Sequence, residues 1–260
     1  MNPCQTCKKM REYIYVMQII DRIIPDISNA RSIIQRPNKY IEPIDPGWIN
    51  RISPLDKQTI DKLINYNGDR NNITKIPESF LEFISKAGKS DGGLFDNLGT
   101  FSIKSAFIDE FVDSNSHIDY FPFLINEINY EYIFDYDIDN GEKIYLLTDE
   151  DENYEHLISD SFEKFVFQTA IDKYERNYLK YVINFHTKYP TADPINNLID
   201  DYHLEVAWFS DTKNIYAYSN DMTLAFSSKV SSYTGNIYLK NRSDVDKVVR
   251  GLEDNLNIEI

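Results

Sequence analysis

Apolar residues recur every three or four positions along several stretches of the chain, a spacing that is typical of amphipathic helices. Three of these stretches begin near a residue suited to cap a helix N-terminus, namely Ser53, Asp160 and Ser243. The apolar spacing predicts helices over residues 10–24, 27–36, 55–67, 77–88, 161–182 and 243–256.

Residues 132–148 carry the clearest strand pattern. Aromatic and aliphatic residues alternate with acidic ones as far as Ile138, and the alternation resumes at Ile144. Between them, Asn140 and Gly141 tolerate the positive φ angles of a tight hairpin turn. We therefore predict a structural β-hairpin whose register these two residues set. Further short strands are predicted over residues 202–208, 214–219, 222–226 and 236–239.

Two proline-containing segments interrupt the pattern. Residues 37–54 hold four prolines and suggest an extended connector, whereas Pro190 and Pro194 suggest a hinge or linker over residues 186–197. The order of elements predicts an α+β fold with a largely antiparallel sheet, flanking helices and a smaller C-terminal ββββα unit. The expected division is an N-terminal helical segment and linker at 1–50, an α+β domain at 51–186 and an appendage at 198–260.

Charge restricts what the protein can bind. The 260 residues include 27 Lys and Arg against 42 Asp and Glu, which gives a net charge of −15. A chain this acidic is repelled by phosphate backbones and by anionic membrane surfaces. We therefore expect neither nucleic acid nor a membrane as a partner, and a basic protein remains compatible with the charge.

The acids are concentrated in one window, residues 131–155, which holds ten of them and a single lysine for a net charge of −9. This window is either a solvated loop or a surface that attracts a basic partner, and such attraction raises the association rate more than the affinity. Six of its acids are the candidate partner-binding residues: Asp135, Asp137, Asp149, Glu150, Asp151 and Glu152.

Residues that could carry metal or catalytic chemistry are few and scattered. Cys4 and Cys7 could form half of a zinc site, but a tetrahedral site needs a second pair of ligands, so two reduced thiols are expected. A calcium loop starting at Asp135 would need Gly and Glu where Asn140 and Leu146 stand. No glycine-rich phosphate loop or nucleophile elbow is present. We expect no catalytic residue, metal or cofactor; an enzyme with dispersed catalytic residues stays an alternative.

The chain also lacks the sequence features of export. Glu12 and Asp21 interrupt the apolar residues that follow Lys8 and Lys9, so no signal peptide is predicted. No run approaches the ~18 uninterrupted apolar residues of a membrane-spanning helix. We expect a cytoplasmic protein.

Three short motifs follow one another in the middle third of the chain. An apolar residue and a proline open an aromatic-rich helix, a Gly-Gly step leads toward a strand, and a hairpin precedes a Ser-Phe-Glu-x-Phe helix start. The residues that carry these motifs are Pro77, Phe80, Gly92, Gly93, Gly141, Ser161, Phe162 and Phe165. In this order the motifs resemble those of the SUKH superfamily, which contains bacterial toxin-immunity proteins and fungal regulators of cell-wall synthesis.

The resemblance implies an α+β fold with a largely antiparallel sheet, and a binding role that needs no cofactor. In that role the protein would be an immunity protein that neutralises a cognate toxin inside the producing cell. Toxin domains that cut nucleic acid tend to be basic because they must approach phosphates, and an acidic inhibitor would attract them. A scaffold or regulator of the fungal type is the alternative.

Overall fold

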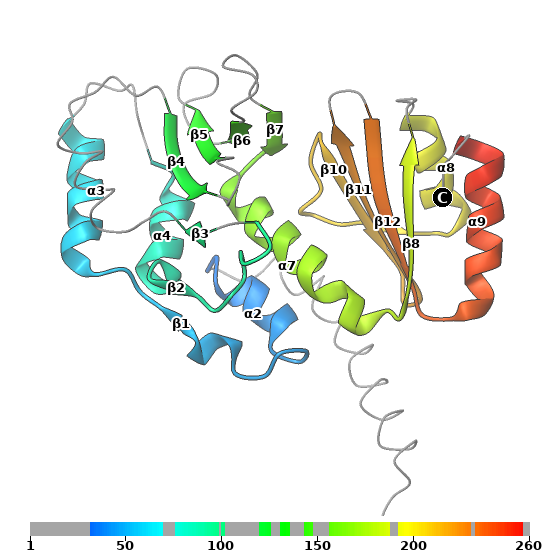
Figure 1. The fold of residues 1–260 in the computed structure, drawn as a ribbon, viewed down its shortest axis with the longest axis horizontal. Coiled ribbons are helices and arrows are strands. Elements are labelled where there is room, and N and C mark those ends of the chain that lie inside the picture. The colour runs from blue at the N-terminus through cyan, green and yellow to red at the C-terminus, as the bar shows by residue number, and fades with distance from the viewer. Residues whose placement is uncertain are drawn as a thin grey trace, which may run out of the picture. The chain divides into compact units, whose positions relative to one another are not determined.

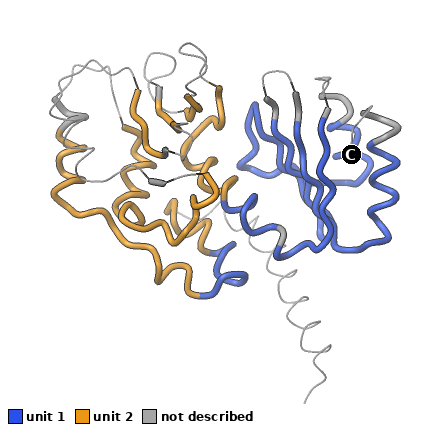
Figure 2. Tube along the Cα trace, in the orientation of Figure 1, with its two compact units in different colours: residues 1–30, 39–46, 170–260 blue, residues 31–38, 47–169 orange. Residues whose placement is uncertain are grey.

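The chain folds into two units, each with its own antiparallel sheet and flanking helices, so the fold class is α+β (Figure 1). Unit 2 is formed by residues 31–38 and 47–169, and unit 1 includes residues 39–46 and 170–260 (Figure 2). The computed structural model describes residues 32–69, 76–98, 100–101, 120–125, 131–135, 143–147, 156–187, 192–229 and 232–256.

The sheet of unit 2 is a meander in which each strand pairs with the next one along the chain, in the order β3-β4-β5-β6-β7. Its strands are β3 (Thr100–Phe101), β4 (Tyr120–Ile125), β5 (Glu131–Asp135), β6 (Ile144–Leu147) and β7 (His156–Ser159). A two-stranded ladder joins β1 (Ile52–Ser53) to β2 (Ser90–Asp91). The helices are the start of α2 (Gln35–Ile41), η1 (Trp48–Asn50), α3 (Lys57–Asp69), α4 (Glu78–Ala87) and the start of α7 (Phe162–Tyr178).

The predicted hairpin is present as the antiparallel pair β5–β6, but with another register. Phe134 lies opposite Ile144, whereas a two-residue turn at Asn140 and Gly141 would place it opposite Leu147. The observed pairing is thus offset by three residues from the pairing that a two-residue turn would give. The prediction that a two-residue turn at Asn140 and Gly141 sets the register is therefore wrong. Gly141 itself lies outside the described residues.

The segment before α3 contains more regular structure than expected. Residues 37–54 are not an extended connector, because α2, a series of turns, η1 and β1 occupy them. Pro37 lies in the first turn of α2, where its missing N–H has no helical partner to lose. Ser53 pairs with Ser90 in the β1–β2 ladder and does not cap α3. Asp56 caps that helix instead, since its carboxylate accepts the Thr59 N–H at 2.9 Å and the Thr59 hydroxyl at 2.7 Å.

Unit 1 contains a five-stranded antiparallel sheet in the order β8-β12-β11-β10-β9. Its elements are β8 (Tyr181–Thr187), α8 (Ala192–Asp201), β9 (Glu205–Val206), β10 (Asn214–Tyr218), β11 (Met222–Lys229), β12 (Ser232–Leu239) and α9 (Arg242–Leu256). The predicted order of four strands and a closing helix is confirmed. The predicted linker at 186–197 is wrong, because β8 runs to Thr187 and α8 begins at Ala192. The predicted cap Ser243 lies inside α9.

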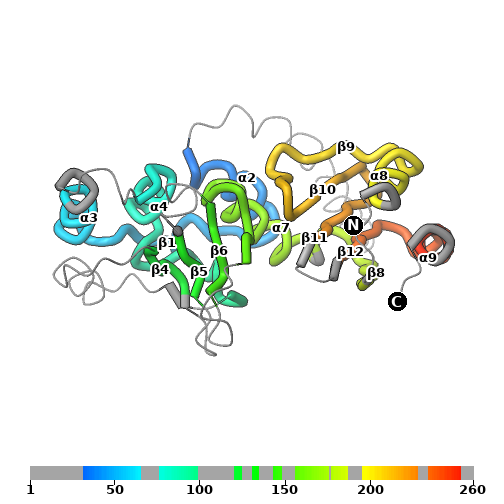
Figure 3. Tube along the Cα trace, turned by 90° about the horizontal axis from the view of Figure 1, so that it is seen from above, coloured from blue at the N-terminus to red at the C-terminus, as the bar shows by residue number. Residues whose placement is uncertain are grey.

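The two faces of this sheet are covered differently. Helices α8 and α9 lie on the same side of it (Figure 3) and contribute Leu198, Val248 and Leu252 to an apolar core with the strands. On the other face, Thr223 and Tyr216 reach residues of α7 between Ala170 and Tyr178. Helix α7 therefore begins in unit 2 and ends in unit 1, where the sequence pattern had placed no boundary.

Candidate functional site

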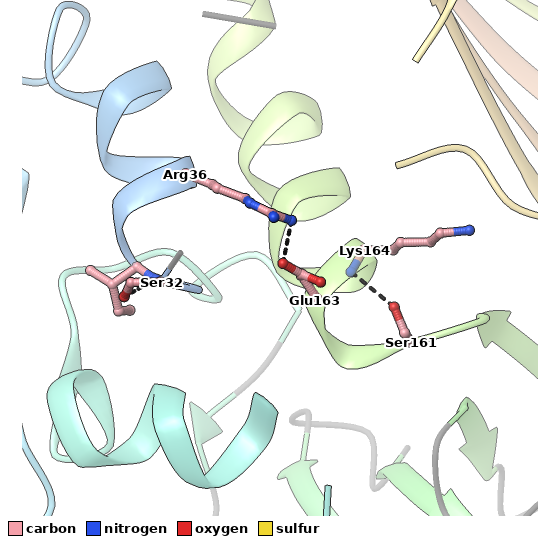
Figure 4. A network of polar contacts seen from close by, with 6 residues as sticks. Ser32, Arg36, Ser161, Glu163 and Lys164 are labelled. Carbon is pink, nitrogen blue, oxygen red and sulfur yellow. Dashed lines mark hydrogen bonds and ion pairs between the residues drawn. The ribbon is translucent and has the colours of Figure 1, made fainter. Parts of the chain in front are cut away.

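The Ser-Phe-Glu-x-Phe motif starts helix α7, and each of its defined residues has a structural role. The Ser161 hydroxyl accepts the Lys164 N–H at 3.2 Å and so caps the helix, which corrects the expected cap at Asp160 (Figure 4). Glu163 in the first turn accepts a hydrogen bond from Arg36 of α2 and forms an ion pair with it. This pair fastens α2 to the N-terminal end of α7, where a negative charge is also favoured by the helix dipole.

The phenylalanines of the motifs meet in one aromatic core. The Phe80 ring of α4 packs edge-to-face on Phe162 at 5.1 Å and on Phe134 of β5 at 5.2 Å between ring centroids. Phe123 of β4 lies 5.9 Å from Phe165, again edge-to-face. Phe80 and Phe162 are fully buried and Phe165 is 3% exposed. These motif residues therefore hold α4, the sheet and α7 together, and present no surface to a ligand.

Gly92 and Gly93 form a turn that only glycine fits well. Their φ angles are 68° and 85°, in the region that L side chains rarely adopt. A Cβ on Gly92 would also lie 2.6 Å from Nε1 of the buried Trp48. The Asp91 carboxylate fixes the turn by accepting the Gly93 N–H at 2.7 Å. The Gly-Gly step is thus a packing requirement beneath Trp48.

Of the six candidate partner-binding acids, the structure describes the backbone of Asp135 alone, as the last residue of β5, paired with Tyr120. Asp137 and residues 149–152 lie outside the described residues. Strands β5 and β6 of the meander lie within the acidic window. The chain leaves β5 at Asp135 at one end of the sheet, and it leaves β6 at Leu147 at the opposite end.

A buried polar cluster in unit 1 was not foreseen. Glu175 of α7 is 2% exposed and accepts hydrogen bonds from the hydroxyls of Tyr40 and Thr223, the latter at 2.7 Å. The Tyr178 hydroxyl donates to the backbone carbonyl of Tyr40 at 2.6 Å. Desolvation raises the pKa of Glu175, and the two hydrogen bonds oppose that rise. The cluster fastens residues 39–46 to α7. An acid four residues after Ile171 of the apolar stripe is the signal that could have revealed it.

A second carboxyl lies one turn earlier on the same helix. The Tyr216 hydroxyl donates to both carboxyl oxygens of Asp172, at 3.1 Å each. Tyr216 is buried, whereas Asp172 keeps solvent-exposed surface. Since water reaches Asp172, this carboxyl forms the outer rim of the cluster and Glu175 its interior.

Unit 1 also contains a small open pocket of about 200 Å³. Its floor is apolar and consists of Met222, Leu239 and Val248, all three of them buried. Its polar rim comes from the β10–β11 turn, from the end of α8 and from the first turns of α9. The rim residues are Tyr202, Ser219, Asp221, Asp244 and Lys247.

Comparison with known proteins finds no match to this chain, whether among family models, curated proteins or solved structures. Within the described part of the chain, no helix is long and apolar enough to cross a membrane. The same residues contain no group of three His, Cys, Asp or Glu side chains that could hold a metal ion. Cys4 and Cys7 lie outside them.

Proposed function

We propose that this protein is an intracellular binding protein that neutralises a cognate toxin by direct contact, and that the toxin is basic. The observation that carries the proposal is the charge distribution, a net −15 of which −9 lies within residues 131–155. A surface field of this sign draws a basic partner toward the inhibitor and repels nucleic acid.

The arrangement of unit 2 supports the choice of an immunity protein of the SUKH type. An aromatic helix, a Gly-Gly turn, a hairpin and a capped helix occur in the order that the resemblance implies, as α4, residues 92–93, β5–β6 and α7. The phenylalanines of the motifs in α4 and α7 are buried in the core, so they are not available to a partner. Partner binding would then fall to other residues of the chain, and the acids of residues 131–155 are the candidates.

The test is co-expression with the protein encoded immediately beside this one. Cells that express that protein alone should stop growing, and co-expression of the present chain should restore growth. Purified samples of the two proteins should form a complex whose association slows as salt is added. If the neighbour is harmless, or if it kills despite co-expression, the immunity function is refuted. Capture of many host proteins in its place would favour the scaffold alternative.

A further inference from the structure

The pocket in unit 1 is too small for a drug-sized ligand or a cofactor. Such ligands occupy sites of roughly 300–1,000 Å³, whereas this pocket measures about 200 Å³. A single side chain of another protein fits that volume better. An apolar floor under a polar rim suits a long side chain with an apolar stem and a charged end.

The pocket is held open by a rigid turn. Tyr202 is the C-cap residue of α8, which ends in a Schellman motif. In this motif the Leu204 N–H donates to the Ile199 carbonyl at 2.8 Å and the His203 N–H donates to the Asp200 carbonyl at 3.1 Å. His203 itself has a φ of 51°. This geometry fixes the backbone beside the Tyr202 ring, so the aromatic wall of the pocket is preformed.

Cations of the chain itself already occupy the rim. The Lys247 ammonium lies 5.1 Å from the centroid of the Tyr202 ring, a cation–π contact. The Lys240 ammonium lies 3.3 Å from a carboxylate oxygen of Asp221. The pKa of Tyr202 is raised by burial and, in addition, by the negative charges of Asp201 and Asp244, which places these two acids within electrostatic reach of the ring.

We propose that this pocket binds an arginine side chain of a basic protein partner. The guanidinium would stack on Tyr202 in place of the Lys247 ammonium and would donate to the carboxylates of Asp221 and Asp244. Arginine is preferred to lysine because its planar guanidinium both stacks on aromatic rings and forms paired hydrogen bonds with carboxylates. The proposal concerns unit 1 and does not require that the partner be a toxin.

The test uses N-acetyl-arginine amide as the probe and the full-length chain with ¹³C-labelled methionine methyl groups. The chain has four methionines, and Met222 lies in the pocket floor, so its methyl resonance reports occupancy. A Met222→Leu variant assigns that resonance. We expect it to shift and saturate with the arginine probe and to respond roughly tenfold more weakly to N-acetyl-citrulline amide, which has nearly the same shape without the charge.

Three variants separate this explanation from others. Asp244→Asn should weaken probe binding by roughly tenfold, whereas Asp246→Asn, an exposed acid two residues away that does not line the pocket, should leave it unchanged. Lys247→Gln should strengthen binding, because it removes the competing cation. The methionine spectrum itself shows whether each variant is folded.

Three results would overturn the proposal: a Met222 resonance that does not respond, an equal response to citrulline, or weaker binding in Lys247→Gln. The last result would show that Lys247 supports the pocket and does not compete with the probe. These outcomes are distinguishable from a failure of the immunity function, because the probe experiment needs neither the toxin nor cell protection.

Discussion

Among the described residues, His203 is the one residue other than glycine with a positive φ. It occupies the C′ position of the Schellman motif that ends α8, where glycine is the usual residue because an L side chain is strained there. We expect His203→Gly to raise the free energy of unfolding by about 1 kcal/mol and His203→Ala to give no such gain. Urea denaturation compares the two. An equal gain in both variants would attribute the effect to loss of the imidazole.

At Gly235 of β12, in contrast to His203, glycine is required because a side chain would not fit. A Cβ at this position would approach the Phe185 ring to 2.2 Å, and Phe185 stacks on Phe226 across the same strand at 6.1 Å. We expect Gly235→Ala to destabilise the protein by about 1–3 kcal/mol, because the ring must leave its place.

Gly251 of α9 is the matched control for that substitution. A Cβ there would meet Tyr202 at an ordinary 3.6 Å, and alanine is the better helix former. Gly251→Ala should therefore stabilise the protein by up to about 1 kcal/mol. If Gly235→Ala matches the wild-type denaturation midpoint, the packing of Phe185 over this glycine is not as described.

At the scale of elements, α7 depends on the aromatic core at its N-terminal end. Phe162→Ala removes a fully buried ring that contacts Phe80 of α4, and such truncations cost about 3–5 kcal/mol. Ile64→Ala on α3 is the control, because that side chain is 49% exposed and its truncation should change the midpoint little. Equal midpoints for the two variants would place Phe162 outside the core and would weaken the SUKH resemblance.

The C-terminal end of α7 gives a pH-dependent prediction. The pKa of Glu175 is raised in the folded protein, mainly by desolvation, while in the unfolded chain it is near 4.5. Above pH 4.5 the folded state therefore holds a proton that the unfolded state has lost, so this group makes stability fall as the pH rises through the interval between the two values.

Glu175→Gln removes this titration. We expect its stability relative to wild type to increase as the pH is raised from about 4.5 toward neutrality, measured by urea denaturation at each pH. Glu205→Gln, at an exposed position on β9, should follow the wild-type curve. If Glu175→Gln also follows it, the carboxyl of Glu175 is not desolvated in the folded protein.

Elements with a clear periodicity could be predicted from the sequence, whereas those that contain proline could not. The ββββα order of unit 1 and the helix after Pro77 follow from alternation and from apolar spacing. Pro37 and Pro194 were interpreted as breaks, yet both lie in the first turn of a helix, where proline is tolerated. Strand β8 was missed because its apolar residues also continue the helical spacing of α7.

The pocket and the Glu175 cluster could not be predicted, for a different reason. Both depend on residues that are distant in the chain and meet through the sheet of unit 1. Tyr40 lies 135 residues from Glu175, and Tyr202 lies 45 residues from Lys247. Periodicity identifies which face of an element is buried, but it does not say which polar groups of different elements meet there.

At the scale of the whole molecule, the −15 charge permits two mechanisms of partner attraction. The charge can act as a diffuse field, or the run 149–152 can act locally. We favour a local effect, because −9 of the charge lies within residues 131–155 and four acids are consecutive at 149–152. The partner would then be attracted mainly by the run 149–152.

A charge-reversed variant distinguishes these mechanisms when it is compared with a control of equal charge change. In this first variant Lys replaces four consecutive acids: Asp149, Glu150, Asp151 and Glu152. The control reverses four exposed acids on separate elements: Asp61, Glu78, Glu205 and Asp246. Local steering predicts that the first variant associates with the cognate partner about tenfold or more slowly at low salt and loses most of its salt dependence, while the control changes little. Stopped-flow association at low and high salt gives both quantities. Equal slowing of the two variants would show that net charge alone attracts the partner. An unchanged association rate in both would remove electrostatic attraction from the mechanism and would leave inhibition by contact intact.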